Sequence, residues 1–422
     1  MWVLNRNPDQ RWHSRRAINM HEELFTLALN LQEPWNVKKI EFNKNGRRLD
    51  IWIDFASGSK FECPECGKRD NPVHDTSDKI WRHLNFFQNK TYLHCRVPRV
   101  SCELCGVHQV KVPWAREKSG FTLLMDALIL IMAEDMPILK VAEIIDEHDT
   151  RIWRVIHYYV EEARGREDFS EIISIGIDEK ACAKGHQYIT VVADLDRSKI
   201  IHVCGGRDSA AVTSFYHDFL NHRGDCEKIQ SICCDMSPAY IAGISKNFPH
   251  SAIIYDKFHV MKIVNHAIDE IRRQEQGHNK YLKKTRYIWL KNPGNLTEKQ
   301  KKQLGSLKDM NLKTVRAYNI KLSLQSFWQI SDKSLAESFL KRWYFWATHS
   351  KLKPIIAVAK TLKSHWEGIV DYFKFPVSNG ILEALNGLIQ STKTAARGFR
   401  SLKYFIAMIY LRLGRLEFNL PT

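Results

Sequence analysis

Two acidic residues directly follow apolar, β-branched segments, and this pattern is typical of a metal-dependent active site that acts on phosphodiester bonds. Asp178 follows residues 172–177, and Asp235 follows residues 229–234. If these segments are neighbouring strands, the carboxylates converge, and close carboxylates repel unless a cation lies between them. Such oxygen ligands suit Mg²⁺ or Mn²⁺, and a pair of these ions stabilises the attacking and leaving oxygens of a phosphodiester. Taken singly, either aspartate is more often a turn residue or a helix N-cap, so the pair carries the hypothesis.

A third carboxylate is expected from a helix, and Glu383 is the best candidate. It is the only Asp or Glu between Lys374 and Lys403, in a segment that is otherwise basic and apolar. A lone carboxylate there either pairs with a base or binds a metal ion. Asp256 follows a further short strand and is a rival for either aspartate role. His259 could contact the scissile phosphate, although packing or solvation is the commoner role of such a histidine.

Four cysteines form two C-x-x-C pairs, in which Cys63 and Cys66 are followed by a glycine, as are Cys102 and Cys105. Four thiolates suit a closed, tetrahedral, structural zinc ion with no open catalytic position. The long spacer predicts a hairpin between the pairs, with short β-like runs such as residues 92–97. The alternative to a zinc site is four buried cysteines that bind nothing. Three further residues in the spacer are expected to be surface or core residues: His74, His83 and Cys95.

The segments around the acids are predicted to be strands and helices in a defined order. Short apolar runs predict strands at residues 172–177, 188–193, 200–203, 229–234 and 253–255. Helices are expected at residues 210–221, from Pro238 onward, and from Asp256 to about Arg273. Three strands, then a helix and a strand that ends in Asp, is the order of a ribonuclease H-like α/β domain. Residues 275–375 are basic, aromatic and helical, and residues 378–416 are helical again.

A helix-turn-helix is predicted between the cysteines and the first acid. Helices are expected at residues 121–133, 138–145 and 151–163, with Asp149 or Thr150 as the cap of the last one. The two helices joined by a tight turn are residues 138–145 and 151–163, and the second helix of such a motif enters the major groove. Arg151 and Arg154 of residues 151–163 are therefore expected to face DNA. Trp153 and Ile156 would then pack inward. The alternative is a generic helical bundle.

Charge and hydropathy narrow the class of protein further. The 422 residues carry a net charge of +16, and residues 257–422 hold 30 Lys and Arg against 11 Asp and Glu. This field attracts a polyanion, most plausibly nucleic acid, although a lysine-rich solvated surface has the same composition. The N-terminus lacks an apolar signal segment, and no apolar stretch reaches the ~20 residues that span a bilayer. A cytoplasmic protein associated with the nucleoid, and not with a membrane, is expected. A hairpin is predicted at residues 36–58 around Asn45-Gly46.

The sequence resembles bacterial insertion-sequence transposases of the ISL3 family, which belong to the DDE class. The stretches that carry the resemblance are residues 176–179, 234–240, 256–260, and 378–400 with its Gly-Phe-Arg ending. The resemblance implies that Asp178, Asp235 and Glu383 are the catalytic triad and hold the Mg²⁺ or Mn²⁺. It also implies that water cuts the DNA at the element's ends to leave 3′-hydroxyls, which then attack target DNA. Lys393 and Arg397 follow Glu383 by about three and four helical turns, so they are expected to share its helical face and to hold DNA phosphate, with ordinary solvation as the alternative. Arg400 is also expected to bind DNA.

The predicted organisation is an α/β ribonuclease H-like catalytic domain interrupted by an all-α insertion and preceded by a zinc-binding β module and a helix-turn-helix. The boundaries are residues 1–60 (β-hairpin region), 61–115 (four-cysteine zinc module), 116–166 (helix-turn-helix), 170–274 and 376–422 (two parts of the catalytic domain), and 275–375 (basic insertion). The expected partners are the terminal inverted repeats, target DNA and a second copy of the chain. The alternatives are a transposase-derived DNA-binding regulator without catalysis and a ribonuclease H-like nuclease.

Overall fold

The computed structural model describes residues 20–183, 187–255, 257–375 and 379–420 of the chain. Contacts divide the chain between Ala133 and Glu134 into two compact units, and Asn419 and Leu420 belong to the first unit. Each unit is described below by itself. None of the helices in the described ranges is long and apolar enough to cross a membrane.

The first unit is built on one six-stranded sheet. Its elements are α1 (Met20–Ala28), β1 (Trp35–Asn43), β2 (Arg48–Phe55), β3 (Lys60–Phe61), β4 (Asn71–Phe86), β5 (Asn89–Cys102) and β6 (Gly106–Gln109). The strand order is β1-β2-β5-β4-β3, with β6 paired to β5. The predicted hairpin at Asn45-Gly46 is confirmed as the antiparallel pair β1 and β2. Because β2 also pairs with β5, one sheet spans the predicted boundary at residue 60.

The spacer between the cysteine pairs forms a long hairpin, as predicted. β4 and β5 are 16 and 14 residues long, much longer than the short runs expected from the sequence. Buried and exposed side chains alternate along much of β5, so one face of this strand packs into the core of the unit. That core includes Leu93, Val97 and Trp35.

Three helices follow in the order predicted for the helix-turn-helix: α2 (Leu123–Asp135), α3 (Ile138–Ile145) and α4 (Asp149–Arg164). The first unit contains most of α2, and the second unit contains α3 and α4. The prediction that Asp149 or Thr150 caps the last helix is wrong. His148 is the N-cap, and its ring Nδ1 accepts a hydrogen bond from the Thr150 amide at 3.3 Å. An imidazole nitrogen satisfies the helix-start amide that a serine or aspartate usually satisfies.

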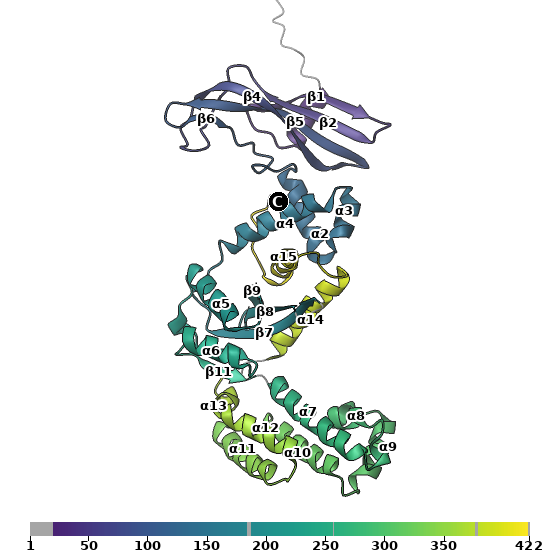
Figure 1. Cartoon of the computed structure of the whole chain (residues 1–422). Coiled ribbons are helices and arrows are strands. Elements are labelled where there is room, and N and C mark those ends of the chain that lie inside the picture. The colour runs from purple at the N-terminus through teal and green to yellow at the C-terminus, as the bar shows by residue number, and fades with distance from the viewer. Residues whose placement is uncertain (1–19, 184–186, 256, 376–378, 421–422) are drawn as a thin grey trace, which may run out of the picture. The chain divides into compact units, whose positions relative to one another are not determined.

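The second unit contains a five-stranded mixed sheet (Figure 1). Its strands are β7 (Ser174–Ala183), β8 (Gln187–Asp194), β9 (Lys199–Gly205), β10 (Ser231–Cys234) and β11 (Ala252–Tyr255). They lie in the order β11-β10-β7-β8-β9. β7, β8 and β9 pair antiparallel, whereas β10 is parallel to both β7 and β11. The five predicted strands are confirmed, although β7 begins later than expected and runs further.

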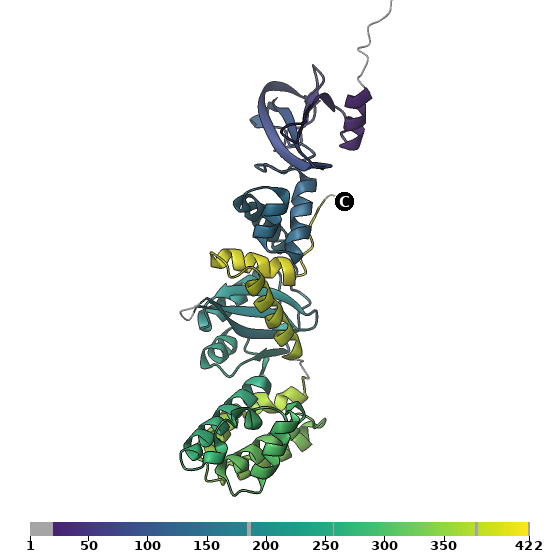
Figure 2. The same ribbon diagram turned by 90° about the vertical axis from the view of Figure 1, so that its right-hand side faces the viewer.

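Helices cover both faces of this sheet. α5 (Ser209–Asn221) and α6 (Pro238–Asn247) pack on the face that carries Ile175 and Ile177, in a core with Phe215 and Tyr240. α14 (Asn379–Ala395) lies along β7, and α15 (Leu402–Leu413) lies against β9 (Figure 2). The C-terminal helices therefore return to the sheet that carries Asp178 and Asp235, as a split domain requires.

The segment between β11 and α14 is helical, as predicted, and residues 275–375 hold no strand. Its main elements are α7 (Lys257–Gln276), α8 (Arg286–Leu290), α9 (Glu298–Lys308), α10 (Lys313–Phe327), α11 (Lys333–Thr348), α12 (Lys353–Ser364) and α13 (Trp366–Val370). These helices share a core of their own that includes Trp289, Tyr318, Phe327 and Trp343. Lys321 is buried and donates to the carbonyls of Trp289 and Leu290 at the end of α8, so one lysine of this basic segment is structural.

Candidate active site, zinc site and DNA-binding elements

Asp178 and Asp235 occupy the same register on two adjacent parallel strands. The last paired residues of β7 and β10 are Gly176 and Cys233, and each aspartate lies two residues further along its own chain. Parallel strands carry equivalent positions at the same height, so Asp178, inside β7, and Asp235, directly after β10, lie at the same height on neighbouring chain segments. The sequence-based expectation that the two acid-bearing strands are neighbours is confirmed.

Backbone amides fix both aspartates. Asp178 Oδ1 accepts a hydrogen bond from the Glu179 amide at 2.8 Å, and Asp235 Oδ1 accepts one from the Ser237 amide at 2.9 Å. The nearby Cys234 thiol has a raised pKa, first because it is buried and then because the charges of Asp235 and Asp178 act on it. Both aspartates therefore lie close enough to Cys234 for their negative charges to disfavour its thiolate.

Helix α14 approaches β7 closely because Gly176 has no side chain. Leu382 covers this glycine, and an ideal Cβ on Gly176 would lie 2.7 Å from Leu382 Cδ1. At the other end of the strand, Lys393 Nζ donates to the Ala181 carbonyl at 3.0 Å. α14 is therefore held against β7 over most of its length.

Between these two contacts, α14 presents Asn386 to Asp178. Asn386 Nδ2 donates to Asp178 Oδ2 at 2.6 Å. Asn386 is absent from the site predicted from the sequence. The available signal was its position three residues after Glu383, which places both residues on neighbouring turns of one helix side.

Glu383 lies on α14 as predicted, but its side chain is exposed. Within the described ranges, the four cysteines are the one group of three or more His, Cys, Asp or Glu residues whose ligand atoms lie within 4.8 Å of one another. The structure thus brings together the strands of Asp178 and Asp235, and it does not bring Glu383 to ligand distance of both. An exposed glutamate on the first turns of a helix has room to reorient.

The other sequence candidates near the acids have different outcomes. Asp256 follows β11 and lies outside the described residues. His259 lines a cavity of about 420 Å³ together with Asp235, Ser237, Lys262 and His266. This cavity places a lysine and two histidines beside the Asp235 carboxylate, which suits an anionic group such as a phosphate.

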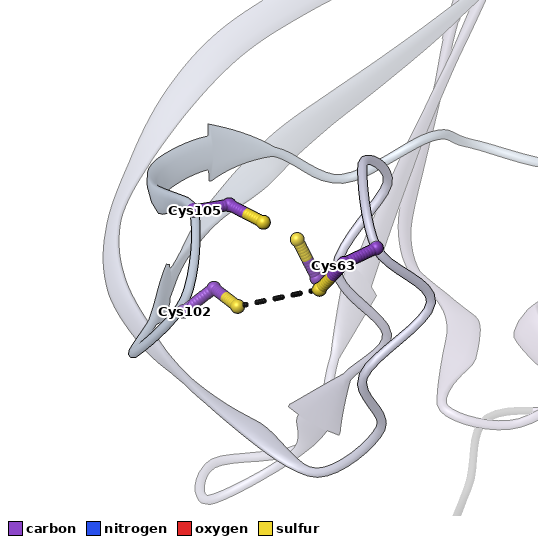
Figure 3. A group of neighbouring side chains, drawn as sticks. Cys63, Cys102 and Cys105 are labelled. Carbon is purple, nitrogen blue, oxygen red and sulfur yellow. Dashed lines mark hydrogen bonds between the residues drawn. The ribbon is translucent and has the colours of Figure 1, made fainter.

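The four cysteines meet in the first unit. Cys63 and Cys66 lie between β3 and β4, Cys102 ends β5, and Cys105 precedes β6. Figure 3 shows the sulfur atoms of Cys63, Cys102 and Cys105 directed toward one another, and all four Sγ atoms lie within 4.8 Å. Four thiols at this spacing fit a tetrahedral zinc ion, so the donor set matches the prediction.

Local backbone geometry shapes the zinc knuckles. Gly67 and Gly106, which follow the two pairs, have φ angles of 71° and 86°, which only glycine adopts without strain. The Leu104 amide, ahead of other causes, lowers the pKa of the Cys102 thiol to about 7. This amide stabilises a thiolate, which is the form that binds a metal ion. The intervening His83 is part-buried and its Nδ1 lies 2.9 Å from Thr122 Oγ1, so it belongs to the fold and not to the metal group.

The predicted DNA-reading helix α4 has the expected inner and outer sides. Trp153 and Ile156 are buried, as predicted, and Trp153 stacks on Tyr404 of α15 with ring centroids 4.2 Å apart. Arg154 is exposed, whereas Arg151 is half-buried and pairs with Glu147. α4 therefore offers Arg154 directly, and Arg151 only if this ion pair opens.

The loop between α14 and α15 carries two exposed arginines, Arg397 and Arg400. They line a cavity of about 660 Å³ with residues of α3 and α4, including Lys140 and Trp153. The expectation that Arg397 shares the helical face of Glu383 is wrong. α14 ends at Ala395 and Arg397 has a φ of 55°, because the chain leaves the helix through a left-handed turn.

Comparisons with known proteins match the four-cysteine segment, the helical segment after it and the segment that carries the acids. Three family models match: one described as "Transposase" over residues 175–409, "Helix-turn-helix domain of transposase family ISL3" over residues 110–160, and "zinc-finger of transposase IS204/IS1001/IS1096/IS1165" over residues 59–105. The chain belongs to the ISL3 family of transposases. It is a DNA transposase, with a zinc ribbon, a helix-turn-helix and a DDE transposase domain, as the sequence predicted.

Two curated relatives of this transposase align along nearly their whole length. The "Transposase for insertion sequence element IS1001" of Bordetella parapertussis is 26% identical over 390 residues, which cover 89% of this chain and 94% of that protein. The "Transposase for insertion sequence element IS1557" of Mycobacterium tuberculosis is 26% identical over 438 residues, which cover 94% of this chain and 97% of that protein.

Proposed function

We propose that this transposase cuts DNA at the ends of its insertion sequence in a divalent-metal-dependent reaction and joins the 3′-hydroxyls to target DNA. The observation that carries the proposal is the shared register of Asp178 and Asp235 on two adjacent parallel strands, within the segment that matches the transposase model. The antiparallel β7-β8-β9 ribbon, followed by two parallel strands, supports a ribonuclease H-like fold for the catalytic domain.

Asp178 and Asp235 are the residues that would hold Mg²⁺ or Mn²⁺, with Glu383 from α14 as the third catalytic carboxylate. The donor set fits this role, because hard divalent cations prefer carboxylate and amide oxygens. Such an ion, when bound, stabilises negative charge on the phosphodiester oxygens and lowers the pKa of water. Backbone amides hold Asp178 and Asp235 so that one oxygen of each is already oriented before a cation arrives.

Separate elements would bind the DNA. Arg154 and Arg151 of α4 would contact the terminal inverted repeats, with Arg397 and Arg400 continuing the basic surface from the loop after α14. Lys393 already donates to the Ala181 carbonyl, so its first role is to fix α14, and its remaining hydrogens can face a phosphate. The zinc ribbon would stabilise the first unit, with its cation held by the four cysteines.

Two copies of the chain are expected to act together on DNA. An insertion sequence has two ends, and in the part of the chain that the structure describes Asp178 of β7 and Asp235, directly after β10, form one pair of aspartates. A homodimer would bring two such sites to two ends at once. Mass photometry of the protein with and without an end-containing duplex tests this stoichiometry directly.

The cleavage experiment uses a labelled fragment of the native locus with both flanks, Mg²⁺ or Mn²⁺, and the wild-type or Asp178→Ala protein. We expect discrete new 3′-hydroxyl ends at the flanks with the wild type and none with the variant. Specific binding without any cut would favour a DNA-binding regulator instead. Cuts that are scattered and unaffected by Asp178→Ala would remove Asp178 from the active site.

A further inference from the structure

Asn386 is the residue through which α14 reaches the proposed catalytic carboxylates. Its amide nitrogen lies 2.6 Å from Asp178 Oδ2. The carboxylate is an acceptor only, so the amide must turn its N–H₂ group toward Asp178 and its oxygen away from that atom. This fixes the orientation of the amide, because the flipped amide would place two oxygens against each other.

The amide oxygen that results is buried and has no partner. Asn386 Oδ1 has almost no solvent-accessible area and no hydrogen-bond partner among the described protein atoms. A buried oxygen without a partner costs about 1–3 kcal/mol, so such atoms are uncommon in folded proteins and call for an explanation. Covalent geometry keeps this oxygen close to the amide nitrogen, and hence close to Asp178.

The surroundings indicate what the missing partner is. Asp178 Oδ1 is taken by the Glu179 amide and Oδ2 by Asn386, while Asp235 lies at the matching position of the next strand. The oxygens of Asp178, Asp235 and Asn386 at this place are hydrogen-bond acceptors. An acceptor without a partner is satisfied either by a cation or by a hydrogen-bond donor. Amide carbonyls join carboxylates as ligands of hard divalent cations.

We propose that Asn386 is a positioning residue of the catalytic metal site: its N–H₂ group holds Asp178 in place, and its amide oxygen is a neutral ligand for the divalent cation. This inference rests on the proposed function, since it assumes that the aspartates bind such a cation. It assigns the contact between α14 and Asp178 to Asn386, in addition to the role proposed for Glu383. It also explains why α14 is fixed at both ends against β7, by Leu382 and by Lys393.

Two substitutions separate the two halves of this role. Asn386→Ala removes both the donor and the oxygen, so we expect Mn²⁺ affinity to fall at least about tenfold. Asn386→Asp keeps an oxygen ligand but loses the donor and adds a charge beside Asp178. We expect it to bind Mn²⁺ at least as tightly as the wild type and to unfold at a lower temperature without Mn²⁺, because the carboxylates repel. Added Mn²⁺ should then raise its melting temperature more than that of the wild type.

The measurements are Mn²⁺ titration by electron paramagnetic resonance and thermal unfolding of the full-length, zinc-loaded chain with and without Mn²⁺. Gln390→Ala is the matched control, since Gln390 is exposed one turn further along α14. It should change neither Mn²⁺ affinity nor the Mn²⁺-dependent shift.

Each remaining outcome counts against a specific statement. If both Asn386 variants bind Mn²⁺ with the affinity of the wild type, Asn386 only packs α14 and this inference is overturned. The same conclusion follows if the melting temperature of each variant is lower than that of the wild type by the same amount with and without Mn²⁺. If the wild-type chain itself binds no Mn²⁺ while it still binds DNA ends, the proposed metal-dependent function fails first, and this inference fails with it.

Discussion

Leu382 of α14 lies over Gly176 of β7 so closely that an ideal Cβ on the glycine would be 2.7 Å from Leu382 Cδ1 and 2.9 Å from Cδ2. A third methyl, Leu195 Cδ2, would lie at 2.8 Å. Gly176 precedes Asp178 by two residues, so both face the same side of the sheet. The absence of a side chain at position 176 is therefore what lets α14 bring its polar residues to the aspartate.

Gly176→Ala should weaken the active site without touching a charged residue. The added methyl overpacks against Leu382 and Leu195, at a cost of about 1–3 kcal/mol, and pushes α14 away from β7. We expect a lower melting temperature and strand cleavage reduced at least tenfold, with end binding retained. Gly387→Ala on the same helix is the control, because a Cβ there meets nothing within 4 Å. That variant should keep full cleavage and gain up to about 1 kcal/mol of stability.

Removal of any one proposed catalytic carboxylate should abolish cleavage while DNA binding persists. Asp178→Asn, Asp235→Asn and Glu383→Gln keep the size of each side chain and remove its charge. Each variant should lose several kcal/mol of transition-state stabilisation, because one charged ligand of the cation is lost. The cleavage rate should therefore fall at least about a hundredfold. Cleavage is measured on labelled ends with Mg²⁺, and binding is measured by fluorescence anisotropy. Normal cleavage by Glu383→Gln would remove the glutamate from the triad and leave the two aspartates with Asn386.

The sequence predicted most of the elements but not how α14 meets the sheet. Apolar runs of three to six residues located all five strands of the second unit, since buried strands need little beyond β-branched side chains. Asn386 escaped prediction because a single asparagine in a helix carries no periodic signal, and its value depends on a contact 208 residues away in the chain. The helix end before Arg397 was missed because an arginine occupies a left-handed position where glycine is the usual signal. Strand lengths in the first unit were underestimated because polar residues alternate on the exposed face of β5.

Loss of one cysteine pair should release zinc and unfold the first unit. In the Cys63→Ser, Cys66→Ser double variant only two of the four thiolates remain, and two ligands cannot close a tetrahedral site. We expect zinc content, measured by mass spectrometry, to fall from about one ion per chain to near zero, together with a lower melting temperature. Cys226→Ser, a half-buried cysteine of the second unit, should keep its zinc. A double variant with unchanged zinc content would refute the four-cysteine site.

Acid should destabilise the first unit in part through His83. Burial, and secondarily Arg82, lowers the pKa of this histidine from 6.5 to about 4 in the folded chain. Because the unfolded state takes up the proton first, the neutral ring stabilises the fold above pH 6.5, and this contribution is lost as the pH falls toward 4. Urea unfolding from pH 7 to pH 4.5 should show a smaller loss of stability in His83→Gln than in the wild type. Parallel stability curves for the two proteins would mean that His83 titrates normally.

Substitution of Arg397 tests DNA contact without straining the backbone at this position. Its φ of 55° is a conformation that glycine adopts freely, so Arg397→Gly removes the guanidinium while it relaxes the turn that ends α14. If Arg397 binds a phosphate, affinity for the element's ends should fall severalfold, and the slope of log affinity against log salt should drop by about one. The melting temperature should stay the same or rise. Arg47→Gly makes the same substitution at a φ of 46° in the β1–β2 turn, and we expect it to leave the salt slope unchanged. Equal slopes for the wild type and Arg397→Gly would place Arg397 away from the DNA.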